Sequence, residues 1–118
     1  MENQLVQVFE NEEFGTVRTL LINNEPLFCL PDVCRILDLR IDGGVVRLLE
    51  DPISTGVLCK QPIQTTGGIQ QMYFVNEYGL YQVIFQSRKP NAIKFQRWVY
   101  HKVLPSIRKY GYYVAPNK

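Results

Sequence analysis

The sequence predicts an α+β fold: an antiparallel, hairpin-built sheet, a short helix pair at about 32–50, and C-terminal helices at about 76–86 and 91–102. Apolar runs rich in β-branched residues alternate with polar turns over residues 5–30 and again over 57–75, which is typical of β-hairpins. Apolar residues recur at helical spacing between these two regions and after the second one. The last third of the chain is therefore expected to be helical.

The strands are predicted from two turn signals. Residues 23–26, Asn-Asn-Glu-Pro, form a polar turn between the apolar runs 16–22 and 27–30. An earlier apolar run over residues 5–9 supplies a further strand. The second signal is the turn Thr65-Thr66-Gly67-Gly68 between two β-type runs. Both signals join strands that follow each other directly, so the sheet is expected to be antiparallel.

The short helix pair is predicted to begin at Pro31-Asp32. Proline fits the first turn of a helix, and aspartate accepts hydrogen bonds from the free N–H groups there. Residues 40–44 end the first helix, and residues 45–49 form the second, which Asp51-Pro52 ends. This is the outline of a helix-turn-helix. A helical corner that only fills space is the alternative, and the short helices with few basic residues favour it.

The two C-terminal helices are predicted from a cap, two apolar stripes and two prolines. Asn76 is expected to cap the first helix, and residues 87–90, Ser-Arg-Lys-Pro, separate it from the second. Pro105 is expected to interrupt the second helix before a last turn over residues 106–109. The expected apolar stripe of the first helix is Leu80, Tyr81, Ile84 and Phe85. The expected buried face of the second is Ala92, Phe95, Trp98, Val99 and Val103.

Length and composition fit one domain over residues 1–118. Hydrophobic residues make up 46% of the chain, and no stretch has the character of a membrane span or a signal peptide. We therefore expect the protein in the cytoplasm of a host cell, or in the nucleus if it comes from a eukaryotic virus. Three cysteines without a CxxC pair suit reduced thiols, and their spacing with His101 matches no common zinc site. Neither a metal nor a cofactor is expected.

Charge is divided sharply along the chain. Residues 78–118 contain eight Lys and Arg and no acid, whereas residues 1–77 contain all 11 acids and only five bases. The formal net charge of +2 therefore combines +8 at one end with −6 at the other. A separated positive charge favours a polyanionic partner, and nucleic acid is the commonest polyanion.

Helical spacing places several of these cations and the one histidine together. Lys94, Arg97 and His101 follow at steps of three and four residues, so they share a face away from the expected core. Arg88 and Lys89 precede this helix, beside free N–H groups that suit a phosphate. The alternatives are a solvated basic face, neutralisation by acids of the N-terminal half, and a protein partner. The cations expected to hold phosphates are Arg88, Lys89, Lys94, Arg97, Lys102, Arg108 and Lys109.

Other functions have weaker support. All seven tyrosines follow residue 70, and exposed aromatics among cations can stack on unpaired bases, which would suit single-stranded DNA or RNA. We expect Tyr78 and Tyr81 to serve packing instead. An enzyme is not expected, because the chain has one histidine, no glycine-rich phosphate loop and no acid among the late cations that could hold a catalytic metal.

The C-terminal half resembles a known family. Residues 74–81, Phe-Val-Asn-Glu-Tyr-Gly-Leu-Tyr, are followed by Ser-Arg-Lys-Pro at 87–90 and by Val-Leu-Pro-Ser-Ile-Arg-Lys at 103–109, with Ala92, Phe95 and Trp98-Val99 between. This pattern closely resembles the Bro-N domain, the N-terminal domain of baculovirus BRO proteins and phage antirepressors. Weaker matches at residues 26–37 extend the resemblance over residues 9–112, nearly the whole chain.

The resemblance implies a non-catalytic module that binds double-stranded DNA, in a phage, prophage or viral antirepressor or other regulator of transcription. Base reading, if present, is expected from Arg35, Arg40 and Arg47, since arginine pairs bidentately with guanine. Residues 51–64 depart from the family pattern by being unusually apolar, which weakens the case for any base contact that the resemblance implies for residues in the 40s to 60s. They would instead be the contact surface if the protein acted by binding a repressor. A homodimer is also considered.

Overall fold

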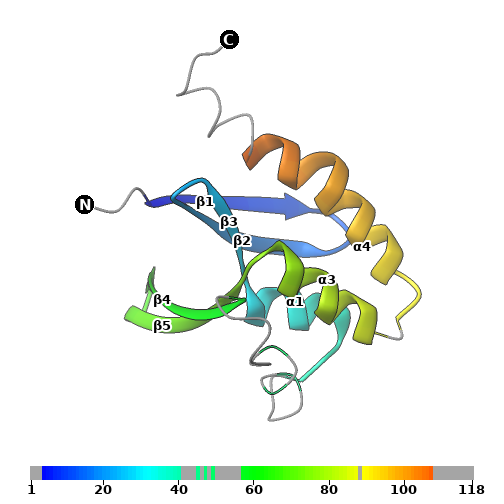
Figure 1. Cartoon of the computed structure of the whole chain (residues 1–118), viewed down its shortest axis with the longest axis horizontal. Coiled ribbons are helices and arrows are strands. Elements are labelled where there is room, and N and C mark those ends of the chain that lie inside the picture. Colours follow the sequence, from blue (N-terminus) through cyan, green and yellow to red (C-terminus); the bar gives the residue numbers. More distant parts are fainter. Residues whose placement is uncertain are drawn as a thin grey trace.

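The computed structural model describes residues 4–40, 45, 47, 49, 57–87 and 89–107 (Figure 1). The described strands form one antiparallel sheet in the order β1-β2-β3-β5-β4, and the helices pack beside it. The α+β class with its hairpin-built sheet is therefore confirmed. The strands are β1 Gln4–Asn11, β2 Gly15–Ile22, β3 Glu25–Cys29, β4 Leu58–Thr65 and β5 Gly68–Val75. The helices are α1 Leu30–Leu37, α3 Glu77–Gln86, α4 Ala92–Trp98 and the π-helical η2 Val99–Val103.

Turn residues fix the two N-terminal hairpins. The side-chain Oδ1 of Asn11 accepts hydrogen bonds from the backbone N–H groups of Glu13 and Phe14 at 2.7 and 3.1 Å, which closes the β1–β2 loop. Asn23 and Asn24 both have positive φ, 53° and 67°, as a two-residue hairpin turn requires. The predicted turn at 23–26 is confirmed but shorter, because residues 25 and 26 already belong to β3.

The β4–β5 hairpin confirms the turn predicted from its glycines. Thr65 pairs with Gly68 across the turn, and Gly68 has a φ of +105°, a conformation that favours glycine. The hairpin joins the rest of the sheet through only two residue pairs, Phe28 with Val75 and Cys29 with Phe74. The remainder of the hairpin extends away from the other strands (Figure 1).

Helix α1 confirms the start predicted at Pro31-Asp32 but corrects the role of the aspartate. The residue before the helix, Cys29, makes no side-chain cap, and Asp32 accepts hydrogen bonds from Arg18 of β2 instead. The helix ends at Leu37, earlier than residues 40–44, because Asp38 adopts the left-handed conformation with a φ of 59°.

Of the second short helix, only three positions lie within the described residues. Val45, Arg47 and Leu49 are helical, as the predicted helix pair requires. Leu49 is 1% exposed and belongs to the main core. This buried position shows that the segment packs against the domain. The rest of the segment, and residues 51–56 after it, lie outside the described residues.

Helix α3 confirms the predicted cap and corrects one residue of the stripe. The side-chain Oδ1 of Asn76 accepts a hydrogen bond from the N–H of Gly79 at 2.9 Å. The buried residues include Leu80, Val83 and Ile84, whereas Phe85 is 85% exposed. Phe85 follows Ile84 by one residue, about 100° around the helix, and this turn moves its side chain away from the core.

The last helix corrects the interruption predicted at Pro105. Helix α4 continues through η2 into helical residues 104–107, so the chain does not break at the proline. The N–H of Leu104 donates to the carbonyl of Val99, five residues back. This spacing of five residues, in place of the four of an α-helix, is that of a π-helical turn. Pro105 has no N–H to donate, and the irregular turn before it accommodates the proline without ending the helix.

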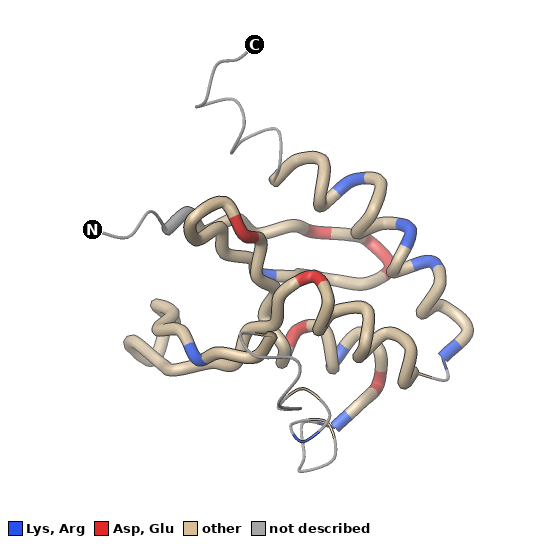
Figure 2. Tube along the Cα trace, in the orientation of Figure 1, with Lys and Arg blue, Asp and Glu red and all other residues tan. Residues whose placement is uncertain are grey.

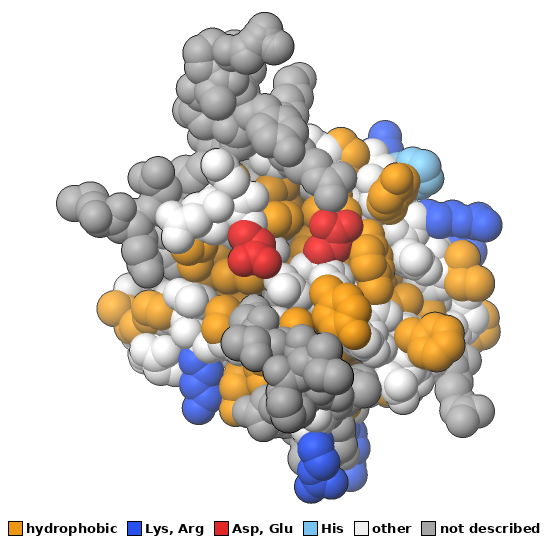
Figure 3. All heavy atoms as spheres, in the orientation of Figure 1, with side chains coloured by type: hydrophobic (Ala, Val, Ile, Leu, Met, Phe, Trp, Pro, Cys, Tyr) orange, Lys and Arg blue, Asp and Glu red, His pale blue; other side chains and the backbone are white. Residues whose placement is uncertain are grey.

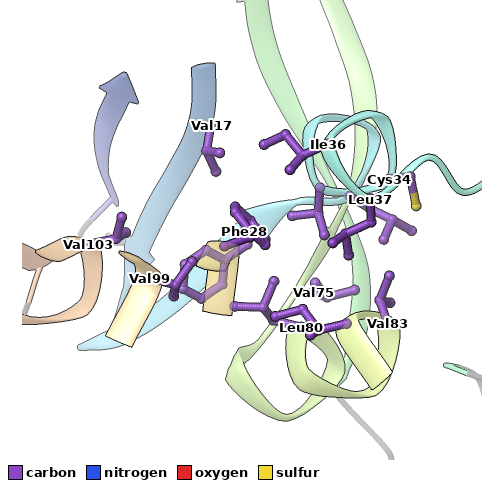
Figure 4. Packing of buried hydrophobic residues seen from close by; sticks show 14 of the residues in the cluster. Val17, Phe28, Cys34, Ile36, Leu37, Val75, Leu80, Val83, Val99 and Val103 are labelled. Carbon is purple, nitrogen blue, oxygen red and sulfur yellow. The ribbon is translucent and has the colours of Figure 1, made fainter. Parts of the chain in front are cut away.

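The main core lies between the helices and one face of the sheet. Figure 4 shows Val99 and Val103 beside Val17 and Phe28, and Leu80 beside Val75. The predicted buried face of the last helix is thus confirmed, with Trp98 partly buried. A second, smaller cluster is formed only by strand residues. Its buried members are Leu20, Leu27, Cys29, Ile63 and Phe74.

Candidate nucleic-acid interface

The outward side of the last helix carries a row of exposed basic side chains. Lys94 and Arg97 of α4 and His101 and Lys102 of η2 are all exposed, opposite the buried residues of the same helix. Figure 2 shows Lys and Arg spaced along the outer edge of α4 and its continuation. The structure therefore confirms the exposure of this predicted basic face. We call Lys89, Lys94, Arg97 and Lys102 the basic row.

One acid of the N-terminal half approaches the basic row. The carboxylate of Glu13, in the β1–β2 loop, lies 3.9 Å from the ammonium group of Lys94, and their side chains are 50% and 68% exposed. Solvent weakens such a pair to between about 0 and 1 kcal/mol. Neutralisation of the basic face by acids of the N-terminal half was one of the alternatives considered from the sequence. Within the described residues, it involves one member of the basic row, Lys94. A phosphate could replace Glu13 at little cost.

The loop before α4 is attached to the end of α1. The hydroxyl of Ser87 donates to the carbonyl oxygen of Leu37 at 3.1 Å, and the Ser87 hydroxyl oxygen accepts a hydrogen bond from the N–H of Lys89 at 3.2 Å. These bonds fix the backbone that carries the exposed Lys89 side chain. Arg88, Arg108 and Lys109, also predicted to hold phosphates, lie outside the described residues.

The arginines proposed for base reading have different surroundings. Arg35 donates to the carbonyl oxygen of Thr16 at 2.7 Å and lies 3.6 Å from Asp32, so its guanidinium group is held by the fold. Arg40 and Arg47 are exposed. Arg40 follows α1, and Figure 2 shows this end of α1 at a different edge of the molecule from the row on α4.

A buried ion pair that the sequence pattern did not reveal joins β2 to α1. Arg18 donates from Nε and a terminal nitrogen to the two oxygens of Asp32, each at 2.9 Å, and the Arg18 backbone N–H donates at 2.9 Å as well. Burial favours the neutral acid, but these hydrogen bonds outweigh it and lower the pKa of Asp32. The ion pair has a structural role, since the Asp32 side chain is only 7% exposed.

The cysteines and acids of the described residues form no chemical centre. Burial raises the pKa of the Cys29 thiol to about 11, so this thiol stays protonated and weakly nucleophilic at neutral pH. Cys34 is also buried and Cys59 partly so, and none of the three cysteines forms a disulfide. Within the part of the chain that the structure describes, no three His, Cys, Asp or Glu side chains gather to hold a metal ion. No helix in that part is long and apolar enough to cross a membrane.

Exposed apolar side chains accompany the basic row. Phe85, Ile93 and Tyr100 are 85%, 59% and 56% exposed, and in Figure 3 hydrophobic side chains lie beside Lys and Arg at the edge formed by α3 and α4. Tyr78, expected in the core or its rim, is 54% exposed, whereas Tyr81 is partly buried and bonds to Glu77 at 3.2 Å. The spacing of the apolar stripe did not reveal that Phe85 is exposed, because it placed Phe85 on the buried face with Leu80 and Ile84.

Figure 3 also shows where negative charge lies on one face. Acidic side chains occupy its middle, and Lys and Arg lie toward its edges. A polyanion would meet repulsion at the middle of this face. The edge along α4 is therefore the better candidate for contact with nucleic acid.

These features define an α+β domain that presents a basic helix beside an antiparallel sheet. The family model of the BRO family, N-terminal domain, matches residues 16–105. The chain belongs to this family, and the resemblance noted from its sequence motifs is confirmed.

Relatives occur in a bacterium and in viruses of invertebrates. An uncharacterized protein of Haemophilus influenzae is 39% identical over 114 residues, which cover 96% of this chain and 55% of the relative. The Bro-N domain-containing protein 201R of Invertebrate iridescent virus 6 is 37% identical, over 82% of this chain and 27% of that protein. Protein 019R of Invertebrate iridescent virus 3, of the same description, is 32% identical over 94% of this chain.

The chain spans only part of each of these relatives, about half of the bacterial protein and 27% to 34% of the two viral ones. The family description and the names of these relatives mention no enzymatic activity. No solved structure matches the chain at a significant level.

Proposed function

We propose that this domain is a non-enzymatic module that binds double-stranded DNA through the edge formed by α4 and η2. The observation that carries the proposal is the basic row: four exposed cations on one continuous helix and the loop before it. The sequence from residue 78 onward contains no acid, so repulsion of phosphates within this segment is absent. Membership of the BRO family supports a role in regulation, as an antirepressor or other regulator of transcription in a phage, prophage or virus.

The cations proposed to contact phosphates and those proposed to contact bases differ in how the fold holds their side chains. Exposed lysines and arginines on a rigid helix suit phosphates, which bind cations without reporting the base sequence. Arg88, Arg108 and Lys109 would extend the row. Arg40 and Arg47 remain the proposed base readers, and Arg35 is the weakest candidate because Thr16 and Asp32 already hold its guanidinium group.

The salt dependence of duplex binding tests the proposal. If the four cations of the basic row each meet a phosphate, log affinity should fall with log salt at a slope of about −3.6, and further contacts would steepen it. Fluorescence anisotropy with a labelled duplex, repeated at several salt concentrations, gives this slope. A slope near zero, or no duplex binding at about 50 mM salt, would refute the proposal.

Two further measurements separate the proposal from its rivals. Tighter binding of oligo-dT than of duplex would indicate a single-strand binder that uses exposed aromatics such as Tyr100. A repressor captured from a host lysate after nuclease treatment, in a complex that survives high salt, would indicate a protein-interaction module. Either result, together with a flat salt slope for duplex, would replace DNA as the main partner.

A further inference from the structure

The two outer strands of the sheet differ in how they are protected. β4 carries Pro62, which has no N–H to offer, and the exposed Lys60, and both features discourage pairing with another strand. β1 is eight residues long and contains neither proline nor a positive charge, and its one charged residue is Glu10 near the end. No described residue pairs with its outer edge. β1 is therefore the edge of this sheet that is open to another strand.

The side chains of β1 strengthen this contrast. Val6 and Val8 are 59% and 54% exposed and lie on the same face of the strand. Val6 pairs with Leu20, a member of the strand-only cluster, so the two valines extend an existing apolar surface to the edge of the sheet. On the opposite face of the strand, Phe9 packs against the main core. In a monomer, an exposed valine pair on an open edge promotes aggregation, whereas in an interface between two strands it would be buried.

The order of residues along β1 is symmetric about Gln7. The run Leu5-Val6-Gln7-Val8-Phe9 has a valine on each side of the glutamine and a large apolar residue beyond each valine. Two antiparallel copies related by a two-fold axis at Gln7 would pair each Val6 with a Val8 and each Glu10 with a Gln4. An axis at Val8 would instead place Glu10 opposite Val6, and an axis at Phe9 would place it opposite Val8. The Gln7 axis matches apolar with apolar and places no two acids of β1 opposite each other.

We propose that β1 pairs antiparallel with β1 of a second copy, about a two-fold axis at Gln7, so that two five-stranded sheets become one ten-stranded sheet. Such an interface is isologous, because each copy offers the same strand to the other. The helices of both copies lie on the same face of the joint sheet, and the four valines form a continuous apolar strip on the other. The proposal does not depend on DNA binding and can fail or succeed separately from it.

The mass of the protein in solution tests the dimer. Sedimentation equilibrium over a wide range of concentration should show the mass approaching twice the 13.7 kDa of one chain. The V6K/V8K double variant places lysines opposite each other across the axis and should raise the dissociation constant at least about tenfold. Both valines are more than half exposed, so the variant should keep the circular dichroism spectrum and melting temperature of the monomer.

A matched control uses the other exposed aliphatic strand residue. Ile69 of β5 is 69% exposed and lies outside the proposed interface, so I69K adds one exposed lysine, against two in V6K/V8K, without weakening the dimer. A wild-type mass that stays at 13.7 kDa, or a dimer that V6K/V8K leaves intact, would overturn the proposal. Equal weakening by I69K and by V6K/V8K would overturn it too, since a general effect of charge would then explain both.

A cross-link tests the register. Residues directly opposite in an antiparallel pair have Cα atoms about 4.5–5.5 Å apart, which a disulfide can span. The Q7C variant should therefore form a disulfide-linked dimer on mild oxidation, visible on a non-reducing gel. The wild-type protein should not form one under the same conditions, because Cys29 and Cys34 are buried and the partly buried Cys59 lies in β4, at the other edge of the sheet. A dimer in solution that gives no Q7C cross-link would overturn the Gln7 axis.

Discussion

The attachment of α4 to the β1–β2 loop depends on Phe14, and its replacement by alanine should destabilise the domain strongly. Phe14 is 7% exposed, and its ring lies 5.5 Å from that of Phe95 and 5.9 Å from that of Trp98, measured between centroids. Removing a buried phenylalanine side chain costs about 3–5 kcal/mol, from lost burial and the cavity left behind. We expect the free energy of unfolding to fall by about 3–4 kcal/mol for Phe14→Ala.

Trp98 is the only tryptophan of the chain and contacts Phe14, so its fluorescence reports unfolding at the site itself. Urea titrations followed by this fluorescence and by circular dichroism give the change in stability. Phe85→Ala is the matched control, because the same side chain is 85% exposed there and its loss should change stability by less than about 0.5 kcal/mol. A loss below about 1 kcal/mol for Phe14→Ala would refute the packing described for α4.

Three further changes test other parts of the fold by the same titrations. Gly79→Ala should cost about 1–3 kcal/mol, because the new Cβ would lie 2.6 Å from Cγ1 of Val57; an unchanged midpoint would contradict this close approach. Asn76→Ala should lower the free energy of unfolding by about 1 kcal/mol, because it removes the cap of α3. An unchanged free energy of unfolding would show that the cap does not stabilise the helix. Asp32→Asn should cost about 3 kcal/mol at pH 7, since it leaves Arg18 without its charged partner.

The Asp32–Arg18 pair also predicts a pH dependence. The folded protein lowers the pKa of Asp32. The carboxylate therefore contributes stability that is fully present at pH values above the pKa of Asp in the unfolded chain, about 3.9. This contribution is lost as the pH falls through the lower folded pKa. Stability measured between neutral and acidic pH should therefore fall less for Asp32→Asn than for the wild type. Parallel curves would assign the acid sensitivity to other groups.

Local signals in the sequence predicted most of the secondary structure. The Asn23-Asn24 turn, the Gly68 turn and the Asn76 cap each depend on neighbouring residues alone, and each is present in the structure. Errors arose where side chains meet across the fold. Asp32 resembles a helix cap in sequence, but Arg18 approaches it from β2 and takes its oxygens. Pro105 resembles a helix breaker, yet a π-helical turn carries the helix past it.

The candidate site was also predictable only where it depends on residues that are close together in the sequence. The exposure of Lys94 and Arg97 follows from helical periodicity, which a sequence displays directly. The pairing of Lys94 with Glu13 and the contact of Arg35 with Thr16 join residues far apart in the chain, so no local pattern contains them. The strand order, which leaves β1 open at one edge, likewise depends on tertiary pairing.

If the basic row binds duplex phosphates, the loss of Arg97 should change the salt dependence of binding. Arg97 is exposed, so its loss should leave the melting temperature within a few degrees of the wild type. Lys60→Ala serves as the control, because Lys60 is an exposed cation on the edge strand β4 and lies outside the basic row. We expect weaker duplex binding for Arg97→Ala and a salt slope shallower by about 0.9, with little change for Lys60→Ala. An unchanged slope for Arg97→Ala, or an equal change for both variants, would contradict this expectation.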